Sequence, residues 1–255
     1  MAISISVPGY ARVRLKGARG LVIESCKNAL ESILASGSLY DFASRQPDAR
    51  KFRGRATAYG IEMGNGCGRV VVRHAMRGGF LGKTGSDLFL PPTRGLRELV
   101  NSLRLGLAGV PTPEVVAFVS YPAGQIFRRS DVATREIPES HDLAVVLREI
   151  ADDEHRVACL AATGKLLALL SKAGAHHPDL NARNVLISWD ASEGAIAHVL
   201  DVDRIRFHVP GDPMVSRANL ARLERSLEKL RERENLGVSE YDIQLIREAA
   251  AKEPA

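Results

Sequence analysis

The sequence predicts an α+β chain of two lobes, a β-rich N-terminal lobe followed by an α-rich C-terminal lobe. Strand patterns separated by glycine turns dominate up to Pro138, and helical patterns dominate after it. A length of 255 residues suffices for one large domain or two small lobes around a cleft. We therefore predict an N-terminal extension with a helix at 1–50, the β-rich lobe at 51–137 and the α-rich lobe at 138–255.

The extension contains the first helical pattern. Apolar residues recur at helical spacing over 21–36, and Gly37 is a plausible stop, so this segment predicts a helix packed on the domain. Residues 38–53 are interpreted as a polar connector.

The β-rich lobe begins with a predicted hairpin. Two strand patterns, within 54–63 and 69–74, flank a glycine-rich turn in which Asn65 and Gly66 supply positive φ. A helix is predicted over 93–108, and further strands follow it before Pro138.

The α-rich lobe is built on one strongly apolar helix. This helix covers 154–173, and Gly174 directly after it is the expected stop. Ser140 is the predicted cap of a shorter helix before it. Two short apolar strands follow the polar loop after Gly174. The tail, 215–252, predicts two charged amphipathic helices interrupted near Gly237.

The composition is that of a soluble globular protein: 45% hydrophobic and 25% charged residues, with a net charge of +5. We find no signal peptide and no apolar run of membrane-spanning length. The positive charge predicts an anionic partner such as a nucleotide or an anionic lipid. Aromatic residues are not interleaved with the basic clusters, so no specific nucleic-acid platform is expected.

The three cysteines give neither a disulfide framework nor zinc-ligand spacing, because Cys26, Cys67 and Cys159 lie far apart. We expect isolated reduced thiols, as is usual for cytoplasmic proteins.

The strongest motif is a polar loop directly after the apolar helix. It reads His-Pro-Asp-Leu-Asn-Ala-Arg-Asn from His177 to Asn184 and leads into a short strand. The next strand ends in Asp-Val-Asp at Asp201, so a hairpin would bring Asn184 and Asp201 to the same end. The motif has the His-x-Asp-x-x-x-x-Asn spacing of kinase catalytic loops, with Pro178 where protein kinases usually carry Arg.

This pattern predicts phosphoryl transfer, in which catalysis is mostly positioning and charge neutralisation. Asp179 is the candidate base for the attacking hydroxyl. Asn184 and Asp201 are candidate ligands for Mg²⁺, which prefers oxygen donors. The alternative is a polar turn whose side chains bond only to local backbone. His177 is interpreted as an anchor of the loop, and the role of Asp203 stays open.

The β-rich lobe is expected to hold the phosphates of ATP. Gly54 begins the strand pair that would cover them, and a cation from the next strand would pair with Glu98 on the predicted helix. Arg73 is preferred for this role over Lys83 because of its place in the strand. Glu98 is otherwise a solvent-facing helix residue.

With these residues considered, the chain resembles the lipopolysaccharide kinases, most of all the 3-deoxy-D-manno-octulosonic acid (Kdo) kinases. The likeness runs from about residue 50 to 231. The segments that carry it are G-R-A-T-A-Y from Gly54, V-V-R-H-A-M-R-G-G from Val71, T-R-G-L-R-E-L from Thr93, V-P-T-P from Val110, H-P-D-L-N-A-R-N-V-L-I from His177, L-D-V-D-R from Leu200 and R-A-N-L-A-R-L-E-R-S-L-E-K-L from Arg217.

The resemblance implies a protein-kinase-like fold of two lobes with a shortened, α-rich C-lobe. It also implies ATP and Mg²⁺ as cosubstrates, and phosphorylation of Kdo on a lipid A precursor in the lipopolysaccharide inner core. It implies that Asp179 is the active-site residue. It also implies a cytoplasmic enzyme that contacts the cytoplasmic face of the inner membrane and takes an anionic, lipid-linked sugar acceptor, which would suit a basic chain. Two departures are Ala56, where the family often has a second glycine, and Val202, where Phe is more usual.

Three other functions remain open on the sequence. An atypical protein kinase of the RIO type also has a shortened catalytic loop. A conventional protein kinase fits poorly, since only about fifty residues follow Asp201 and they contain no A-P-E segment. A non-catalytic kinase-like scaffold would not need Asp179, Asn184 and Asp201 together, and nucleic-acid binding is suggested by charge alone.

Overall fold

The computed structural model describes residues 7–52, 56–75, 94–150, 152–234 and 236–252. The chain divides into two compact units. Unit 1 comprises Met1–Val100 and Glu114–Glu136, and unit 2 comprises Asn101–Pro113 and Ile137–Ala255. Helix α3 (Arg94–Leu107) confirms the helix predicted over 93–108. The boundary between the two units, between Val100 and Asn101, falls inside this helix.

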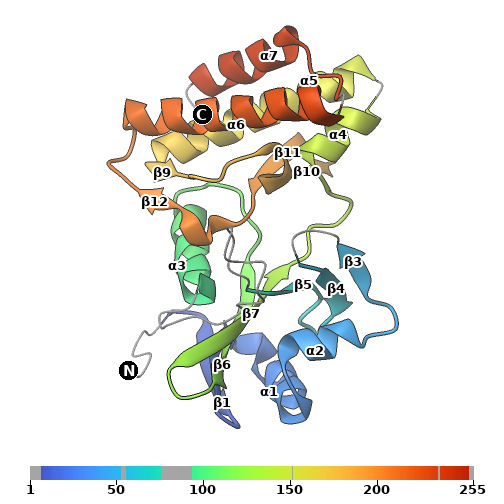
Figure 1. Cartoon of the computed structure of the whole chain (residues 1–255), viewed down its shortest axis with the longest axis vertical. Helices are drawn as coiled ribbons and strands as arrows, with labels where there is room; N and C mark the ends of the chain where they lie inside the picture. The colour runs from blue at the N-terminus through green and yellow to red at the C-terminus, as the bar shows by residue number, and fades with distance from the viewer. Residues whose placement is uncertain (1–6, 53–55, 76–93, 151, 235, 253–255) are drawn as a thin grey trace. The chain divides into compact units, whose positions relative to one another are not determined.

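Unit 1 is built on a seven-stranded antiparallel sheet (Figure 1). In spatial order its strands are β1 (Tyr10–Leu15), β2 (Ala18–Ile23), β6 (Val115–Ala123), β7 (Phe127–Arg135), β5 (Arg69–His74), β4 (Ala58–Glu62) and β3 (Arg50–Phe52). Two helices, α1 (Lys27–Ser36) and α2 (Leu39–Ser44), pack on it. The predicted β4–β5 turn is confirmed, with φ of 49° at Asn65 and 75° at Gly66.

The prediction for residues 21–53 was wrong at two places. Residues 21–23 end strand β2 instead of beginning a helix, because Leu21 and Val22 pair with β6 and are buried there. Periodicity alone does not separate a strand from a helix in so short a run. The expected polar connector contains α2 and β3, and Ser38 caps α2 by accepting the backbone N–H of Asp41 at 3.0 Å.

The cysteine prediction was also wrong. Cys26 and Cys67 form a disulfide inside unit 1, with 5.4 Å between their Cα atoms, and Cys159 is a buried free thiol. Cys26 precedes α1, and Cys67 lies in the β4–β5 turn. The two cysteines are 41 residues apart in the sequence, so their spacing gave no sign of the contact. They meet because α1 packs on the sheet that contains β4 and β5.

Unit 2 is mainly helical, so the α+β prediction is confirmed. Its helices are α4 (Leu143–Glu149), α5 (Asp153–Lys172), α6 (Pro213–Glu234) and α7 (Glu240–Ala251). Its short strands are β8 (His141–Asp142), β10 (Val185–Asp190) and β11 (Gly194–Val199) in one sheet, and β9 (Ala175–His176) with β12 (Arg206–Phe207) in another. The predicted tail is confirmed as α6 and α7. The cap of α4 differs from the prediction, since Asp142 and not Ser140 accepts the N–H of Val145 at 3.0 Å.

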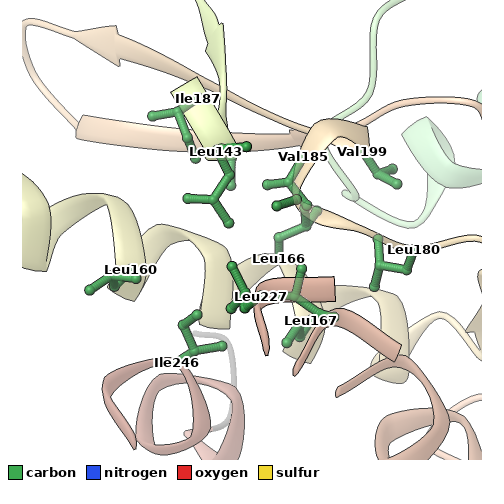
Figure 2. Packing of buried hydrophobic residues seen from close by; sticks show 14 of the residues in the cluster. Leu143, Leu160, Leu166, Leu167, Leu180, Val185, Ile187, Val199, Leu227 and Ile246 are labelled. Carbon is green, nitrogen blue, oxygen red and sulfur yellow. The ribbon is translucent and has the colours of Figure 1, made fainter. Parts of the chain in front are cut away.

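Each unit has its own hydrophobic core. In unit 2, side chains of α5 such as Leu166 and Leu167 pack with Leu227 of α6, Ile246 of α7 and Val185 of β10 (Figure 2). The core of unit 1 lies between its sheet and α1 and α2. Among the described residues, no helix is both long and apolar enough to cross a bilayer.

Candidate active site

The loop between α5 and β10 is held in place by His177, which is fully buried. Nε2 of His177 lies 2.9 Å from the carbonyl oxygen of Leu200, and Nδ1 accepts the backbone N–H of Asp179 at 3.2 Å. The backbone N–H of His177 donates to Oδ1 of Asn219 at 2.9 Å. The interpretation of His177 as a loop anchor is therefore confirmed.

The chemistry of this anchor requires a neutral imidazole. Nδ1 accepts a hydrogen bond, so Nε2 carries the proton that is donated to Leu200. Burial lowers the pKa of His177 below its ordinary value, because the interior disfavours the charged form. The ring is thus suited to positioning the loop and not to carrying a charge at neutral pH.

Two asparagines that the sequence reasoning missed complete this framework. Asn219 is fully buried on α6, and its Nδ2 donates to the carbonyl of Ala175 at 2.9 Å. Asn101, on the part of α3 that belongs to unit 2, donates to the carbonyl of Val202 at 2.7 Å. A signal for Asn219 existed, since it lies at four-residue spacing between the apolar residues Val215 and Leu223. A buried polar residue on an apolar stripe needs partners.

The carboxylate of Asp179 faces two arginines that the sequence did not identify. Nη1 of Arg204 pairs with its Oδ2, and Nη2 of Arg222 lies 3.7 Å from its Oδ1. The side chain of Asp179 is 33% exposed, so it is accessible to a ligand while its orientation is restricted. Arg204 follows the Asp-Val-Asp motif, and Arg222 comes from α6.

Asn184 is oriented by the same loop. Its Nδ2 donates to the backbone carbonyl of Asp179 at 3.0 Å, which leaves the amide oxygen available for a different contact. It ends the short 3₁₀ helix Ala182–Asn184, and its own carbonyl accepts the N–H of Leu200 at 2.9 Å. Strands β10 and β11 pair in the register Val185 to Val199, so the hairpin places Asn184 and Asp201 at the same end, as predicted.

Asp201 has an unusual backbone. Its φ of 54° and ψ of 43° lie in the left-handed region, which few residues other than glycine adopt and in which Asp and Asn are the commonest exceptions. Val202, directly after it, is buried and held by Asn101. Strained residues of this kind persist where the surroundings impose them, and they concentrate at functional sites.

The oxygen donors at this end of the hairpin suit a hard cation. The described residues contain no cluster of three or more His, Cys, Asp or Glu side chains around one ion position. The candidate set is instead the carboxylate of Asp201 with the amide oxygen of Asn184. This donor chemistry fits Mg²⁺, which is commonly held by few protein oxygens together with substrate phosphates.

Unit 1 brings together the other predicted pair. Arg73 on β5 forms an ion pair with Glu98 on α3, and the Glu98 side chain is only 5% exposed. Glu98 is therefore not a solvent-facing residue. Gly54 and Lys83, the remaining predicted phosphate-binding residues, lie outside the described residues.

Comparison with known proteins identifies the family. Residues 48–249 match the model of the lipopolysaccharide kinase (Kdo/WaaP) family. The chain belongs to this family. This lipopolysaccharide kinase family member is thus a phosphotransferase that acts on a sugar hydroxyl and uses ATP, and the protein-kinase and scaffold alternatives are not favoured.

Several curated relatives of this family member carry one description, 3-deoxy-D-manno-octulosonic acid kinase. The protein from Vibrio parahaemolyticus is 30% identical over 77% of this chain and 79% of its own length. The protein from Xanthomonas oryzae pv. oryzae is 33% identical over 64% of each chain. Among solved structures, WaaP in complex with acyl carrier protein matches with a TM-score of 0.54 and 17% identity, covering 88% of this chain and 87% of that one. This likeness confirms the protein-kinase-like fold.

Proposed function

We propose that this lipopolysaccharide kinase transfers the γ-phosphate of ATP to a hydroxyl of Kdo in the inner core, on a lipid A precursor. One observation carries the proposal from the structural side. In unit 2, a hydrogen-bonded loop presents Asp179 and orients Asn184 at the hairpin end that also holds the strained Asp201. The Kdo kinases among the curated relatives support the choice of acceptor.

Asp179 is the proposed catalytic carboxylate. Its carboxylate orients the acceptor hydroxyl and accepts its proton while the hydroxyl oxygen bonds to the γ-phosphorus and the bond to ADP breaks. Arg204 and Arg222 restrict the carboxylate to this orientation through their ion pairs. His177 acts one step further away, because it fixes the backbone N–H of Asp179.

Two sets of groups are proposed to bind the phosphates of ATP. Asn184 and Asp201 would hold Mg²⁺, which supplies neutralisation of phosphate charge when bound. Arg73, fixed by Glu98, is the proposed cation for the α- and β-phosphates. Gly54 and Lys83 stay predictions for the same function, as do the lobe divisions 1–50, 51–137 and 138–255.

We also propose that the enzyme works in contact with the cytoplasmic face of the inner membrane. The acceptor is lipid-linked and anionic, and a chain with a net charge of +5 is attracted to such a surface. This contact is peripheral in the proposal.

The decisive experiment incubates the protein with γ-labelled ATP, Mg²⁺ and Kdo-bearing lipid A precursor, followed by mass spectrometry of the lipid. The expected product has one added phosphate on Kdo. Asp179→Asn should lower the rate by roughly 10²- to 10⁴-fold, the contribution typical of a positioned proton acceptor. Asp48→Asn, at an exposed position that is not part of the proposed site, is the matched control and should keep the wild-type rate. Wild-type rates in Asp179→Asn would disprove the assignment, and transfer to protein instead of lipid would disprove the acceptor.

A further inference from the structure

A pocket in unit 2 lies directly beside the Asp179 loop. One wall is formed by the loop residues Leu180 and Asn181, and the other by α6. The cationic residues of α6 in this wall recur every three or four positions and therefore share one helix face: Arg222, Arg225, Lys229 and Arg233. We call this space the α6 pocket.

The α6 pocket carries uncompensated positive charge. Its one lining carboxylate, Glu234, already bonds to Arg148 at 2.7 Å and to Arg183 at 2.6 Å. In the described part of the chain, no carboxylate pairs with Arg225, Lys229 or Arg233. Like charges at this spacing repel one another along a helix, so a bound anion would relieve a cost that the free protein carries.

Arg222 supplies a second, independent observation. Its Nε is buried and lacks a hydrogen-bond partner within the described structure. Such a buried donor is unfavourable unless a ligand or water completes it. The same side chain reaches Asp179, with Nη2 3.7 Å from Oδ1, so it links the α6 pocket to the proposed catalytic carboxylate.

We propose that the α6 pocket binds an anionic oxygen group of the acceptor, either the carboxylate of its sugar acid or a phosphate of its lipid carrier. The identity of the acceptor rests on the proposed function. Guanidinium groups bind carboxylate and phosphate through paired, charge-assisted hydrogen bonds. A group held there lies next to the loop that presents Asp179, so a neighbouring sugar hydroxyl is brought toward that carboxylate.

The size of the pocket limits its occupant. It encloses about 220 Å³, less than the roughly 300–1,000 Å³ of pockets that take drug-sized ligands. It therefore suits one charged head group and not the acyl chains. Exposed cations line it, as expected for a site that selects by charge.

The test compares two triple variants that remove the same charge. One carries Arg225→Gln, Lys229→Gln and Arg233→Gln. The control carries Lys165→Gln, Lys172→Gln and Arg231→Gln, which are exposed positions of unit 2 outside the pocket. Arg222 is left unchanged because it contacts Asp179. We measure binding of Kdo-bearing lipid A precursor without ATP, then the KM values for the precursor and for ATP.

The pocket variant should raise the Kd and the KM for the precursor by roughly tenfold or more, since charge-assisted hydrogen bonds are lost. Its KM for ATP should not change, and the control should match the wild type. Two modified acceptors identify the bound group. If the Kd values of pocket variant and wild type become equal for precursor that lacks the lipid phosphates, the pocket binds a phosphate. If they become equal for precursor whose sugar carboxylate is amidated, the pocket binds the carboxylate.

The outcomes separate this inference from the proposed function. Transfer to Kdo with equal precursor binding in the pocket variant and control would overturn the inference and leave the function standing. Precursor binding that is weakened only in the pocket variant supports the inference even where no phosphorylated Kdo forms, a result that would overturn the function. A wild type that binds no precursor would overturn both.

Discussion

Among single residues, His177 and Asn219 position the proposed catalytic loop, and Asn101 holds the segment that follows Asp201. None of the three contacts the acceptor in our proposal. Each hydrogen-bonds to backbone groups, and the two bonds of Asn219 are buried. Removing one such partner typically costs about 1–3 kcal/mol, since the remaining group keeps its desolvation penalty. Loss of these side chains should therefore disturb both stability and the placement of Asp179.

His177 also predicts a pH dependence of stability. Burial lowers its pKa in the folded state, so below the unfolded-state pKa of about 6.5 the unfolded chain binds more protons and the free energy of unfolding decreases. We expect a loss of up to ~1.4 kcal/mol per pH unit from this residue as the pH falls from about 6.5 toward its folded-state pKa. His177→Gln should be less stable at neutral pH but should lose less stability on acidification.

Urea unfolding at several pH values measures how the free energy of unfolding changes with pH in the wild type and in His177→Gln. Burial lowers the pKa of His198 as well, so a residual slope is expected in the variant. Parallel curves for wild type and His177→Gln would contradict the prediction, because they would mean that His177 titrates equally in both states.

Arg73 and Arg69 on β5 provide matched ion pairs. Arg73 pairs with Glu98, and Arg69 pairs with Glu136 at 2.9 Å. Replacing both members of a pair by Met avoids leaving one charge buried alone. Arg73→Met with Glu98→Met should raise the KM for ATP by roughly tenfold or more, the effect of losing a charge-assisted hydrogen bond.

The matched control is Arg69→Met with Glu136→Met, which should leave the KM for ATP unchanged. Steady-state kinetics at saturating acceptor measures both. An equal rise in the two double variants would point to a general effect on the sheet and against a phosphate-binding role of Arg73.

At the scale of elements, α6 combines two functions on two faces. Its apolar face packs in the core through Leu223 and Leu227 and includes the buried Asn219. Its cationic face lines the α6 pocket. Close packing elsewhere in unit 2 depends on small residues, as at Gly164 of α5, where a Cβ atom would lie 2.5 Å from the Cβ of Ala249 on α7.

The disulfide in unit 1 links the residue before α1 to the β4–β5 turn, and its presence can be measured. Thiol titration in denaturant without reductant should find one thiol, that of Cys159, in the wild type. Reductant should lower the free energy of unfolding of unit 1 by about 2–4 kcal/mol, the usual contribution of a disulfide. Cys67→Ala should not respond to reductant. Three thiols in the unreduced wild type would contradict the prediction.

In the molecule as a whole, the described residues form two hydrophobic cores, one in each unit. Leu30 is fully buried in the core of unit 1, and Leu166 is buried in the core of unit 2. Large-to-small changes in such positions create cavities and usually cost about 2–5 kcal/mol. Separate cores allow the consequences to stay within one unit.

We therefore expect Leu30→Ala to speed amide hydrogen exchange mainly in unit 1, and Leu166→Ala to speed it mainly in unit 2. Each variant is the control for the other. Hydrogen exchange followed by mass spectrometry of peptides reports the location. Equal acceleration across both units in either variant would show that the chain unfolds as one cooperative block.

The sequence predicted the features that depend on local pattern. Glycine and asparagine marked the β4–β5 turn, long apolar periodicity marked α5, and two short apolar runs marked the β10–β11 hairpin. Because the hairpin is local, the sequence also predicted that Asn184 and Asp201 lie at the same end. Short apolar runs such as residues 21–23 were ambiguous, since a strand and a helix bury them equally well.

The α+β class, the catalytic-loop pattern around Asp179 and the resemblance to lipopolysaccharide kinases can all be read from the amino-acid sequence. Which distant groups meet becomes visible in the folded chain: Arg204 and Arg222 at the Asp179 carboxylate, Asn219 at His177, and Cys26 at Cys67. The physical reason is that spacing along the chain encodes contacts within a helix or a hairpin. Contacts between elements depend on how those elements pack, which no local pattern records.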